Sequence, residues 1–215
     1  MKVLSVSDVE AGIIYSPQIR DRFTGIEMAI SCGDLPYYYL EYIIDMLDVP
    51  MYYVLGNHAN QEEISNEGSR YSPWGGINLH RKVFYDRHLI MAGIEGSVRY
   101  NNGPHQYNQR EMWLAVWSLV PKLFFQHMRY GRYLDIFITH APPWGIHDAD
   151  DPPHRGIKAF NWLIKVFQPR YHFHGHTHIY RADAIKETRV VETLVINTCG
   201  YREIDLEVVN SIRRK

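Results

Sequence analysis

Side chains that can bind a metal ion or move a proton follow five short apolar segments of this 215-residue chain. The residues that follow these segments are Asp8, Glu10, Asp34, Asn57, His58, His140, His176 and His178. Each of them alone also fits a plain structural role, such as a turn residue or a helix cap. Carboxylates, an amide and imidazoles together suit Mn, Fe, Zn or Co better than calcium or an iron–sulfur cluster. The coincidence of five such endings therefore predicts one shared metal site.

The segments that must position these side chains are typical of buried β-strands. They are 2–7, 28–32, 51–55, 135–139 and 171–174. In open α/β sheets, ligands bind at the carboxyl ends of the strands. Five strand ends that carry polar residues are therefore expected to meet at one edge of the fold.

The remaining pattern alternates helices with further strands, which predicts an α/β fold with a mixed sheet or two stacked sheets. A helix with Pro36 in its first turn carries apolar residues at helical spacing up to Leu47. We expect the other elements to be helices at 17–23, 111–128 (broken near Pro121) and 156–167, a hairpin of 83–85 with 89–93, strands at 189–197 and 203–208, and loops at 68–78 and 101–108.

The stretch YHFHGHTHIY, residues 171–180, places four histidines at every second position. An unbroken strand would line all four on one face, but Gly175 in the middle indicates a break. We expect the strand to end near His174 and the following turn to aim His176 and His178 at the site. His172 and His174 are then expected to pack inside the strand, with His174 supporting a ligand from behind.

Composition disfavours nucleic-acid-binding, disulfide-rich and membrane-spanning proteins. Lys and Arg number 23 against 24 Asp and Glu, so we expect no general nucleic-acid binding. Two cysteines make no disulfide framework, and no apolar run is long enough to span a membrane. These features predict a soluble, cytoplasmic protein with one domain over residues 1–215.

In their order and spacing, these motifs resemble those of the calcineurin-like metallophosphoesterases. The motifs are Asp8-x-Glu10, Gly33-Asp34, Gly56-Asn57-His58, His140 and Gly175-His176-x-His178. A lone GD or DxE would mean little, whereas GNH and GHTH together are specific. The resemblance implies an α/β four-layer αββα sandwich, with two mixed β-sheets flanked by helices.

The resemblance also implies a site with two metal ions, Mn first, with Fe, Zn, Co or Ni as alternatives. Asp34 would bridge both ions. Asp8 and His178, with Glu10, would hold the first ion, and Asn57, His140 and His176 the second. A hydroxide shared by the ions would attack phosphorus, and His58 would protonate the leaving oxygen.

Three positions depart from the family pattern. Glu10 stands where the family usually has His, which adds negative charge and favours Mn or Fe if it ligates. Ala59 follows GNH where Asp or Glu is common. Tyr37 stands where the protein-phosphatase branch has the Asp that orients the catalytic His. His58 therefore lacks both carboxylate partners that neighbouring sequence usually supplies, and a protein phosphatase is disfavoured.

The stretch 140–156, HAPPWGIHDADDPPHRG, follows one candidate ligand and is stiffened by two Pro pairs. Trp144 and His147 are candidates to line a substrate pocket there. His154, just before Gly156 and a helix start, and Arg155 are our candidate substrate-binding residues. The aromatic, Gly-rich loop from Tyr100 to Gly103 could stack on a base or an aromatic leaving group.

We therefore expect a metal-dependent phosphoric ester hydrolase that acts on a small phosphodiester or phosphomonoester. No large insertion covers the site, which favours a small phosphorylated substrate over a nucleic-acid backbone. A nucleotide pyrophosphatase is an alternative within the enzyme class. An interaction scaffold on the same fold is an alternative outside it.

Overall fold

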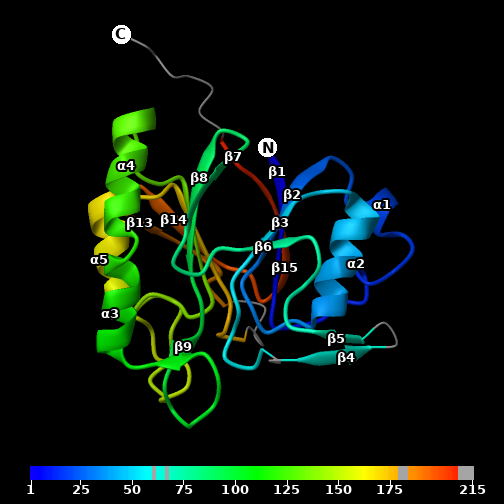
Figure 1. Cartoon of the computed structure of the whole chain (residues 1–215), viewed down its shortest axis with the longest axis horizontal. Coiled ribbons are helices and arrows are strands. Elements are labelled where there is room, and N and C mark those ends of the chain that lie inside the picture. Colours follow the sequence, from blue (N-terminus) through cyan, green and yellow to red (C-terminus); the bar gives the residue numbers. More distant parts are fainter. Residues whose placement is uncertain (60–61, 66–67, 179–183, 208–215) are drawn as a thin grey trace.

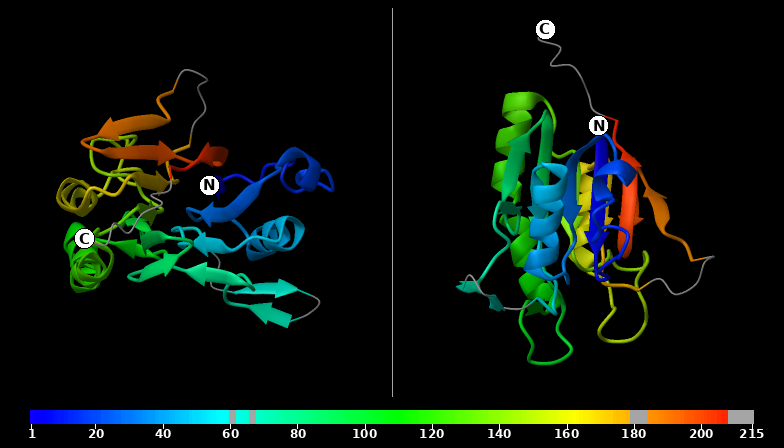
Figure 2. Two further views of the ribbon diagram at one scale, coloured as in Figure 1. Left: turned by 90° about the horizontal axis from the view of Figure 1, so that it is seen from above. Right: turned by 90° about the vertical axis from the view of Figure 1, so that its right-hand side faces the viewer.

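The structure, a computed structural model, describes residues 1–59, 62–65, 68–178 and 184–207. Two large sheets lie face to face, and helices cover the outer face of each (Figure 1). Figure 2 shows the same layers from above and from one side. This is the four-layer αββα sandwich that the sequence predicts.

The first sheet has five strands in the order β15, β1, β2, β3, β6. Its strands are β15 (Gly200–Asp205), β1 (Lys2–Ser7), β2 (Ile26–Ser31), β3 (Met51–Tyr53) and β6 (Gly76–Asn78). Strands β1, β2, β3 and β6 are parallel, and β15 is antiparallel to β1. The parallel part of this sheet brings the ends of β1, β2 and β3 to one edge.

The second sheet has six strands in the order β13, β14, β12, β11, β8, β7. Its strands are β13 (Glu187–Val190), β14 (Thr193–Asn197), β12 (Tyr171–His174), β11 (Ile136–Thr139), β8 (Leu89–Ile94) and β7 (Val83–Asp86). The four central strands are parallel, and the two edge strands are antiparallel to their neighbours. Both sheets are therefore mixed.

The helices lie in two outer layers. Their bounds are α1 (Ile19–Arg22), α2 (Tyr37–Leu47), α3 (Gln109–Trp117), α4 (Val120–Tyr130) and α5 (Lys158–Phe167). Helices α1 and α2 cover the first sheet, and α3, α4 and α5 cover the second (Figure 1). As predicted, the pattern over 111–128 breaks near Pro121, which lies in the first turn of α4. Proline is tolerated there because its missing N–H has no helical partner.

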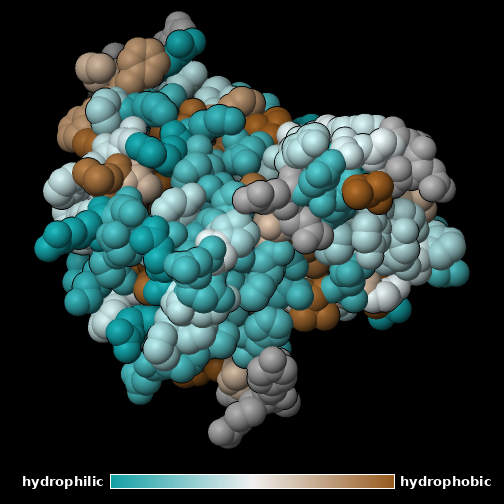
Figure 3. Space-filling model, turned by 60° about the horizontal axis from the view of Figure 1, so that its bottom comes forward, coloured by the Kyte–Doolittle hydropathy of each residue, from teal (hydrophilic) through white to brown (hydrophobic). Residues whose placement is uncertain are grey.

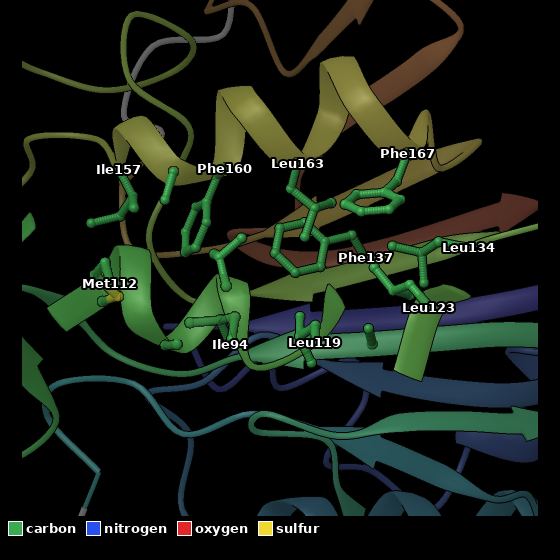
Figure 4. Packing of buried hydrophobic residues seen from close by; sticks show 14 of the residues in the cluster. Ile94, Met112, Leu119, Leu123, Leu134, Phe137, Ile157, Phe160, Leu163 and Phe167 are labelled. Atoms are coloured by element: carbon green, nitrogen blue, oxygen red, sulfur yellow. The ribbon is translucent and has the colours of Figure 1, made fainter. Parts of the chain in front are cut away.

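Three buried apolar clusters fill the three spaces between the four layers. Strand alternation divides each strand between two of them: Phe137 of β11 packs toward the helices, while Ile136 and Ile138 pack between the sheets. Figure 4 shows the helix-side cluster, where Phe160 and Leu163 of α5 face Phe137. The sheets are thus fixed against each other and against the helices, which holds their strand ends in place.

Three expectations about strands and loops were wrong in detail. Residues 189–197 form a hairpin of β13 and β14, because Val191 turns the chain with a φ of 54°. A β-branched residue seldom adopts this left-handed backbone, so no sequence signal marked the turn.

The region 68–78, expected to be a loop, contains β5 (Gly68–Arg70), which pairs with β4 (Glu63–Ser65), and the edge strand β6. These strands have three residues each, too few to show an alternating pattern. The predicted loop 101–108 likewise includes β10 (Gln106–Tyr107), which pairs with β9 (Ser97–Val98).

The helices in the described part of the chain are all too short or too polar to cross a membrane.

Candidate metal centre

The carboxyl ends of five strands meet where the two sheets touch, toward the bottom of Figure 1. Hydrogen bonds within the second sheet and between the two sheets fix this junction. The Gly175 N–H donates to the His140 carbonyl at 3.0 Å, and the Ser7 and Thr198 hydroxyls lie 3.0 Å apart. Figure 3 brings this face forward, and its centre is largely hydrophilic. The structure thus places the predicted polar strand ends together.

Asp34, His140 and His176 form a group whose ligand atoms lie within 4.8 Å of one another among the described residues. Asn57 joins this group, because its Oδ1 lies 3.0 Å from His140 Nε2. We call Asp34, Asn57, His140 and His176 the inner half of the centre. Asp8, Glu10 and His178 form its outer half.

His140 is fully buried and is held from both sides. Its Nδ1–H donates to the Cys32 carbonyl at 2.7 Å, which turns Nε2 toward Asp34 Oδ2 at 3.1 Å and Asn57 Oδ1 at 3.0 Å. Burial disfavours the charged ring, but the Asp34 carboxylate outweighs it and raises the pKa of His140 to about 9. In the metal-free chain, a proton on Nε2 therefore satisfies the two oxygens.

Asp34 is the anionic partner of that ring. Burial opposes its ionisation, but His140 and the hydrogen bond from the His58 N–H outweigh burial and lower the pKa of Asp34 to about 2. The His58 N–H lies 2.8 Å from Asp34 Oδ1. Gly56 allows this approach, because a Cβ there would lie 2.0 Å from Asp34 Oδ1.

Asp8 and His176 connect the two sheets. The His176 N–H donates to both carboxylate oxygens of Asp8, each at 3.0 Å. A Cβ on Gly175 would lie 2.5 Å from Asp8 Oδ2, so the glycine predicted as a break is required for this contact. Burial raises the pKa of Asp8, against the opposing charge of His140.

The His176 ring itself is buried and neutral. Burial lowers the pKa of His176 to about 3, and the charge on His140 adds to this effect. Its Nε2–H donates to the Pro153 carbonyl at 2.6 Å, and its ring centroid lies 4.7 Å from that of His140. The His176 side chain thus lies at the site, but its hydrogen bond goes to the loop that carries Pro153.

Asp8, Asp34 and His176 share an unusual backbone. Their φ angles are 63°, 55° and 68°, in the left-handed region that non-glycine residues rarely adopt. Such strain persists only where surrounding contacts enforce it, and it concentrates at functional sites. Three candidate ligands in this conformation therefore indicate a built site.

The outer half, apart from Asp8, is more exposed than the inner half. Glu10 is exposed, and its carboxylate accepts a hydrogen bond from the Tyr38 hydroxyl. That bond raises the pKa of Tyr38 to about 12. His178 is exposed too, and its charge acts on Asp8. Glu10 and His178 lie outside the inner group, and their predicted roles as ligands stay predictions.

His58 is exposed beside Asn57 and lines a pocket of about 360 Å³ with Ala59 and Tyr100. Its Nε2 lies 3.5 Å from the Tyr100 hydroxyl, which also accepts from Asn57 Nδ2 at 3.2 Å. The partner of His58 is thus a tyrosine 42 residues away. Sequence reasoning listed Tyr100 only as a stacking candidate, because no local pattern points to this contact.

The two predicted substrate-binding residues lie on the loop after β11. The His154 Nδ1 is 2.6 Å from Asp151 Oδ2, and its ring centroid lies 5.2 Å from that of His176. Arg155 instead donates to the Asp150 carbonyl and lies near the Trp144 ring, away from the inner half's hydrogen bonds. The structure therefore brings His154 to the metal centre more directly than Arg155.

His172 and His174 pack inside, as predicted. The His172 Nε2 is 2.8 Å from the Thr139 hydroxyl, and His174 Nε2 is 2.9 Å from His147 Nδ1. Burial lowers the pKa of His172 to about 3, and it lowers the pKa of His174 well below its usual value. His147, a candidate pocket residue, thus points into the protein toward His174 and Thr188.

The inner half fits a transition-metal ion. One imidazole nitrogen, one carboxylate oxygen and one amide oxygen converge at one point, and a second imidazole lies beside them. The Cys32 carbonyl fixes the His140 tautomer in the way that typical metal sites fix their histidines. These donors suit Mn, Fe, Zn or Co.

Comparisons with known proteins agree with this description of the fold. One solved structure superposes with a TM-score of 0.64 at 14% identity, covering 95% of this chain and 94% of that one. The structure of TT1561 from Thermus thermophilus superposes with a TM-score of 0.58 at 15% identity, covering 93% and 89%. At these identities the likeness concerns the fold alone. No curated protein sequence matches the chain.

The sequence itself matches the model of one protein family. The match runs over residues 2–180, which include every residue of both halves of the centre. The chain therefore belongs to the calcineurin-like phosphoesterase family.

Proposed function

We propose that the chain is a metal-dependent phosphoric ester hydrolase that acts on a small phosphodiester or phosphomonoester. The observation that carries this proposal is the convergence of Asp34 Oδ2 and Asn57 Oδ1 on His140 Nε2, with His58 next in sequence to Asn57. The family match supports the same class of chemistry.

The proposed cofactor is a pair of metal ions, with Mn preferred because of the oxygen-rich donor set. Asn57, His140 and His176 would hold one ion, Asp8, Glu10 and His178 the other, and Asp34 both. When bound, such a pair activates a water and polarises the phosphoryl oxygens.

The chain's own residues then have distinct tasks. His58 Nε2, which faces the pocket beside Tyr100, would give its proton to the leaving oxygen as the P–O bond breaks. The His58 backbone N–H holds the Asp34 carboxylate in orientation at 2.8 Å. His154, hydrogen-bonded to Asp151, would donate to a phosphoryl oxygen from the opposite loop.

The surroundings of the site favour a small substrate. The pocket next to His58 has a volume of about 360 Å³, and its lining includes Asn101, Pro104 and Gln106. Among the described residues that line it, none is Lys or Arg, so this lining offers no cationic track for a nucleic-acid backbone. A neutral leaving group suits this pocket.

The test is hydrolysis of bis(p-nitrophenyl) phosphate by protein stripped with a chelator and reloaded with Mn²⁺. We expect turnover that depends on Mn²⁺ and falls about 10²- to 10⁴-fold in His58→Ala, the usual contribution of a general acid. Calorimetric Mn²⁺ binding should be the same in both proteins.

A matched control is His88→Asn, which removes an exposed histidine from the β7–β8 turn and keeps a residue that tolerates its φ of 65°. This variant should match the wild type. Wild-type turnover that does not depend on Mn²⁺ would contradict the proposal. A His58→Ala variant as active as the wild type would contradict it too.

A second candidate function, a non-catalytic interaction scaffold, has two observations in its favour. Glu10 is bonded to Tyr38 and not to the site. Helices α3 and α4 also expose large apolar side chains: Leu114, Trp117, Phe124, Phe125 and Met128. Absence of calorimetric metal binding, together with inert diester, monoester and pyrophosphate substrates, would favour the scaffold.

A further inference from the structure

Tyr100 lies where a candidate metal ligand and the candidate general acid meet. Its hydroxyl accepts a hydrogen bond from Asn57 Nδ2 at 3.2 Å and lies 3.5 Å from His58 Nε2. Asn57, His58 and Tyr100 line one pocket. One hydroxyl thus touches both residues of the Gly56-Asn57-His58 motif that would act in the reaction.

The contact with Asn57 decides which end of the amide faces the metal centre. Because the NH₂ group donates to Tyr100, Oδ1 is the atom that lies 3.0 Å from His140 Nε2. Only the oxygen of an amide ligates a cation. Without the Tyr100 hydroxyl, the amide loses a contact that orients it and keeps the one between Oδ1 and His140 Nε2, so its orientation is less well fixed.

The contact with His58 holds an otherwise exposed ring. The backbone of His58 is fixed by Asp34, but the imidazole has no sequence-local carboxylate, since Ala59 and Tyr37 occupy the family positions. A phenol oxygen has two lone pairs, so it can accept from Asn57 Nδ2–H and from His58 Nε2–H together. The Tyr100 hydroxyl therefore keeps His58 Nε2 at the pocket wall until a leaving oxygen replaces that hydroxyl as its partner.

The loop that carries Tyr100 is fastened from within. The buried Gln106 side chain accepts hydrogen bonds from the Tyr100 and Asn101 N–H groups, both at 3.1 Å. Its Nε2 donates to Asn101 Oδ1 at 2.6 Å, and Arg99 donates to the Gln106 carbonyl. Tyr100 is thus held in place before any substrate binds, which reduces the ordering that binding must impose.

We propose that Tyr100 is a positioning residue for the reaction, replacing the carboxylate partner that His58 lacks and orienting the Asn57 amide toward the metal. This inference rests on the proposed function. It adds a residue that the family motifs do not contain. One hydroxyl of this residue would support both metal binding by Asn57 and proton donation by His58.

The test compares Tyr100→Phe with wild type in two readouts. Calorimetric titration with Mn²⁺ should show the tighter site weakened by about tenfold, a usual effect of losing a group that orients a ligand. At saturating Mn²⁺, kcat for diphenyl phosphate should fall about tenfold more than kcat for bis(p-nitrophenyl) phosphate, because a poorer leaving group needs the proton more. KM should change little for either substrate.

Tyr107→Phe is the matched control. It removes a hydroxyl from the other end of the same loop, where Tyr107 donates to Glu95 at 2.7 Å. We expect a lower unfolding midpoint, with Mn²⁺ affinity and the ratio of the two kcat values unchanged. The control separates loss of a loop contact from loss of the specific Asn57 and His58 contacts.

The outcomes divide cleanly. Equal losses for both substrates with unchanged Mn²⁺ affinity would make Tyr100 a structural residue and overturn the inference. Weaker Mn²⁺ binding with equal rate losses for the two substrates would support the role of Tyr100 toward Asn57 and overturn its role toward His58. If the wild type binds Mn²⁺ but hydrolyses neither these diesters nor the monoester p-nitrophenyl phosphate, the proposed function fails. In that case the Mn²⁺ affinity of Tyr100→Phe still tests whether Tyr100 orients Asn57. The proposed role of Tyr100 toward His58 is then refuted together with the reaction.

Discussion

The inner and outer halves of the metal centre differ in how far their side chains are exposed: Asn57, His140 and His176 are buried, whereas two of the three outer residues are exposed. In the inner half, His140 is fixed by the Cys32 carbonyl, Asn57 by Tyr100, and Asp34 by the His58 N–H. In the outer half, Glu10 and His178 are exposed, and the Glu10 carboxylate is bonded to Tyr38. A preformed set of ligands loses little freedom on binding a cation. The comparison teaches that the two metal ions should bind with unequal affinity, the inner one more tightly.

The largest effect is expected from replacing Asp34, the inner-half residue that would ligate both metal ions. Asp34→Asn removes the carboxylate that lies 3.1 Å from the buried His140 Nε2. We expect calorimetry to show both Mn²⁺ sites lost. The metal-free chain should lose about 3 kcal/mol in its free energy of unfolding, the low end for a broken buried ion pair, because His140 can release its proton.

Asp205→Asn is the control for this prediction, since Asp205 is exposed at the end of β15. It should change neither Mn²⁺ binding nor the denaturation midpoint. An Asp34→Asn chain that still binds two Mn²⁺ ions would disprove the bridging role.

The next effect comes from the proton on His140. The folded, metal-free chain raises the pKa of His140 from 6.5 to about 9. The stability that the charged ring contributes is therefore complete below pH 6.5 and is lost as the pH rises through 9. An ion at Nε2 must displace this proton, so affinity for Mn²⁺ in the inner half should rise by about tenfold per pH unit within that window.

Calorimetry from about pH 6.5 to about pH 8.5, in buffers of different ionisation enthalpy, measures both the affinity and the proton released. His176 should add nothing to this release, because burial lowers its pKa to about 3 and its ring is already neutral. A flat affinity over this pH range would show that His140 does not ligate.

Glu10 provides a test of the outer half alone. In Glu10→Ala, we expect the weaker Mn²⁺ site to lose about tenfold in affinity and the tighter site to stay within about twofold, because the two halves share only Asp34. Both constants come from one two-site titration. If instead the tighter site weakens, the assignment of affinities to the two halves is wrong.

The sequence predicted which strand ends bring their polar side chains together, because its signals are local. The candidate ligands follow five strands within a few residues, and parallel strands bring such ends together. The partners of those ligands were not predictable in the same way. The Tyr38–Glu10 and Tyr100–Asn57 bonds join residues 28 and 43 positions apart, and only the packing of helix α2 and the loop after β9 brings them together. Likewise, the left-handed turn at Val191 has no residue type that marks it.

The smallest expected effect tests whether Tyr38 competes with the outer metal ion for the Glu10 carboxylate. Tyr38 donates to the carboxylate that the outer metal ion would need, so Tyr38→Phe should release Glu10. We expect the weaker Mn²⁺ site to tighten about fivefold, which corresponds to about 1 kcal/mol, the usual net worth of one hydrogen bond. Tyr42→Phe removes a hydroxyl from the same helix and serves as the control, with no change expected. The sign of the change is informative: weaker binding in Tyr38→Phe would mean that the tyrosine orients Glu10 as a ligand, as Tyr100 orients Asn57. The outer half would then be as firmly built as the inner one.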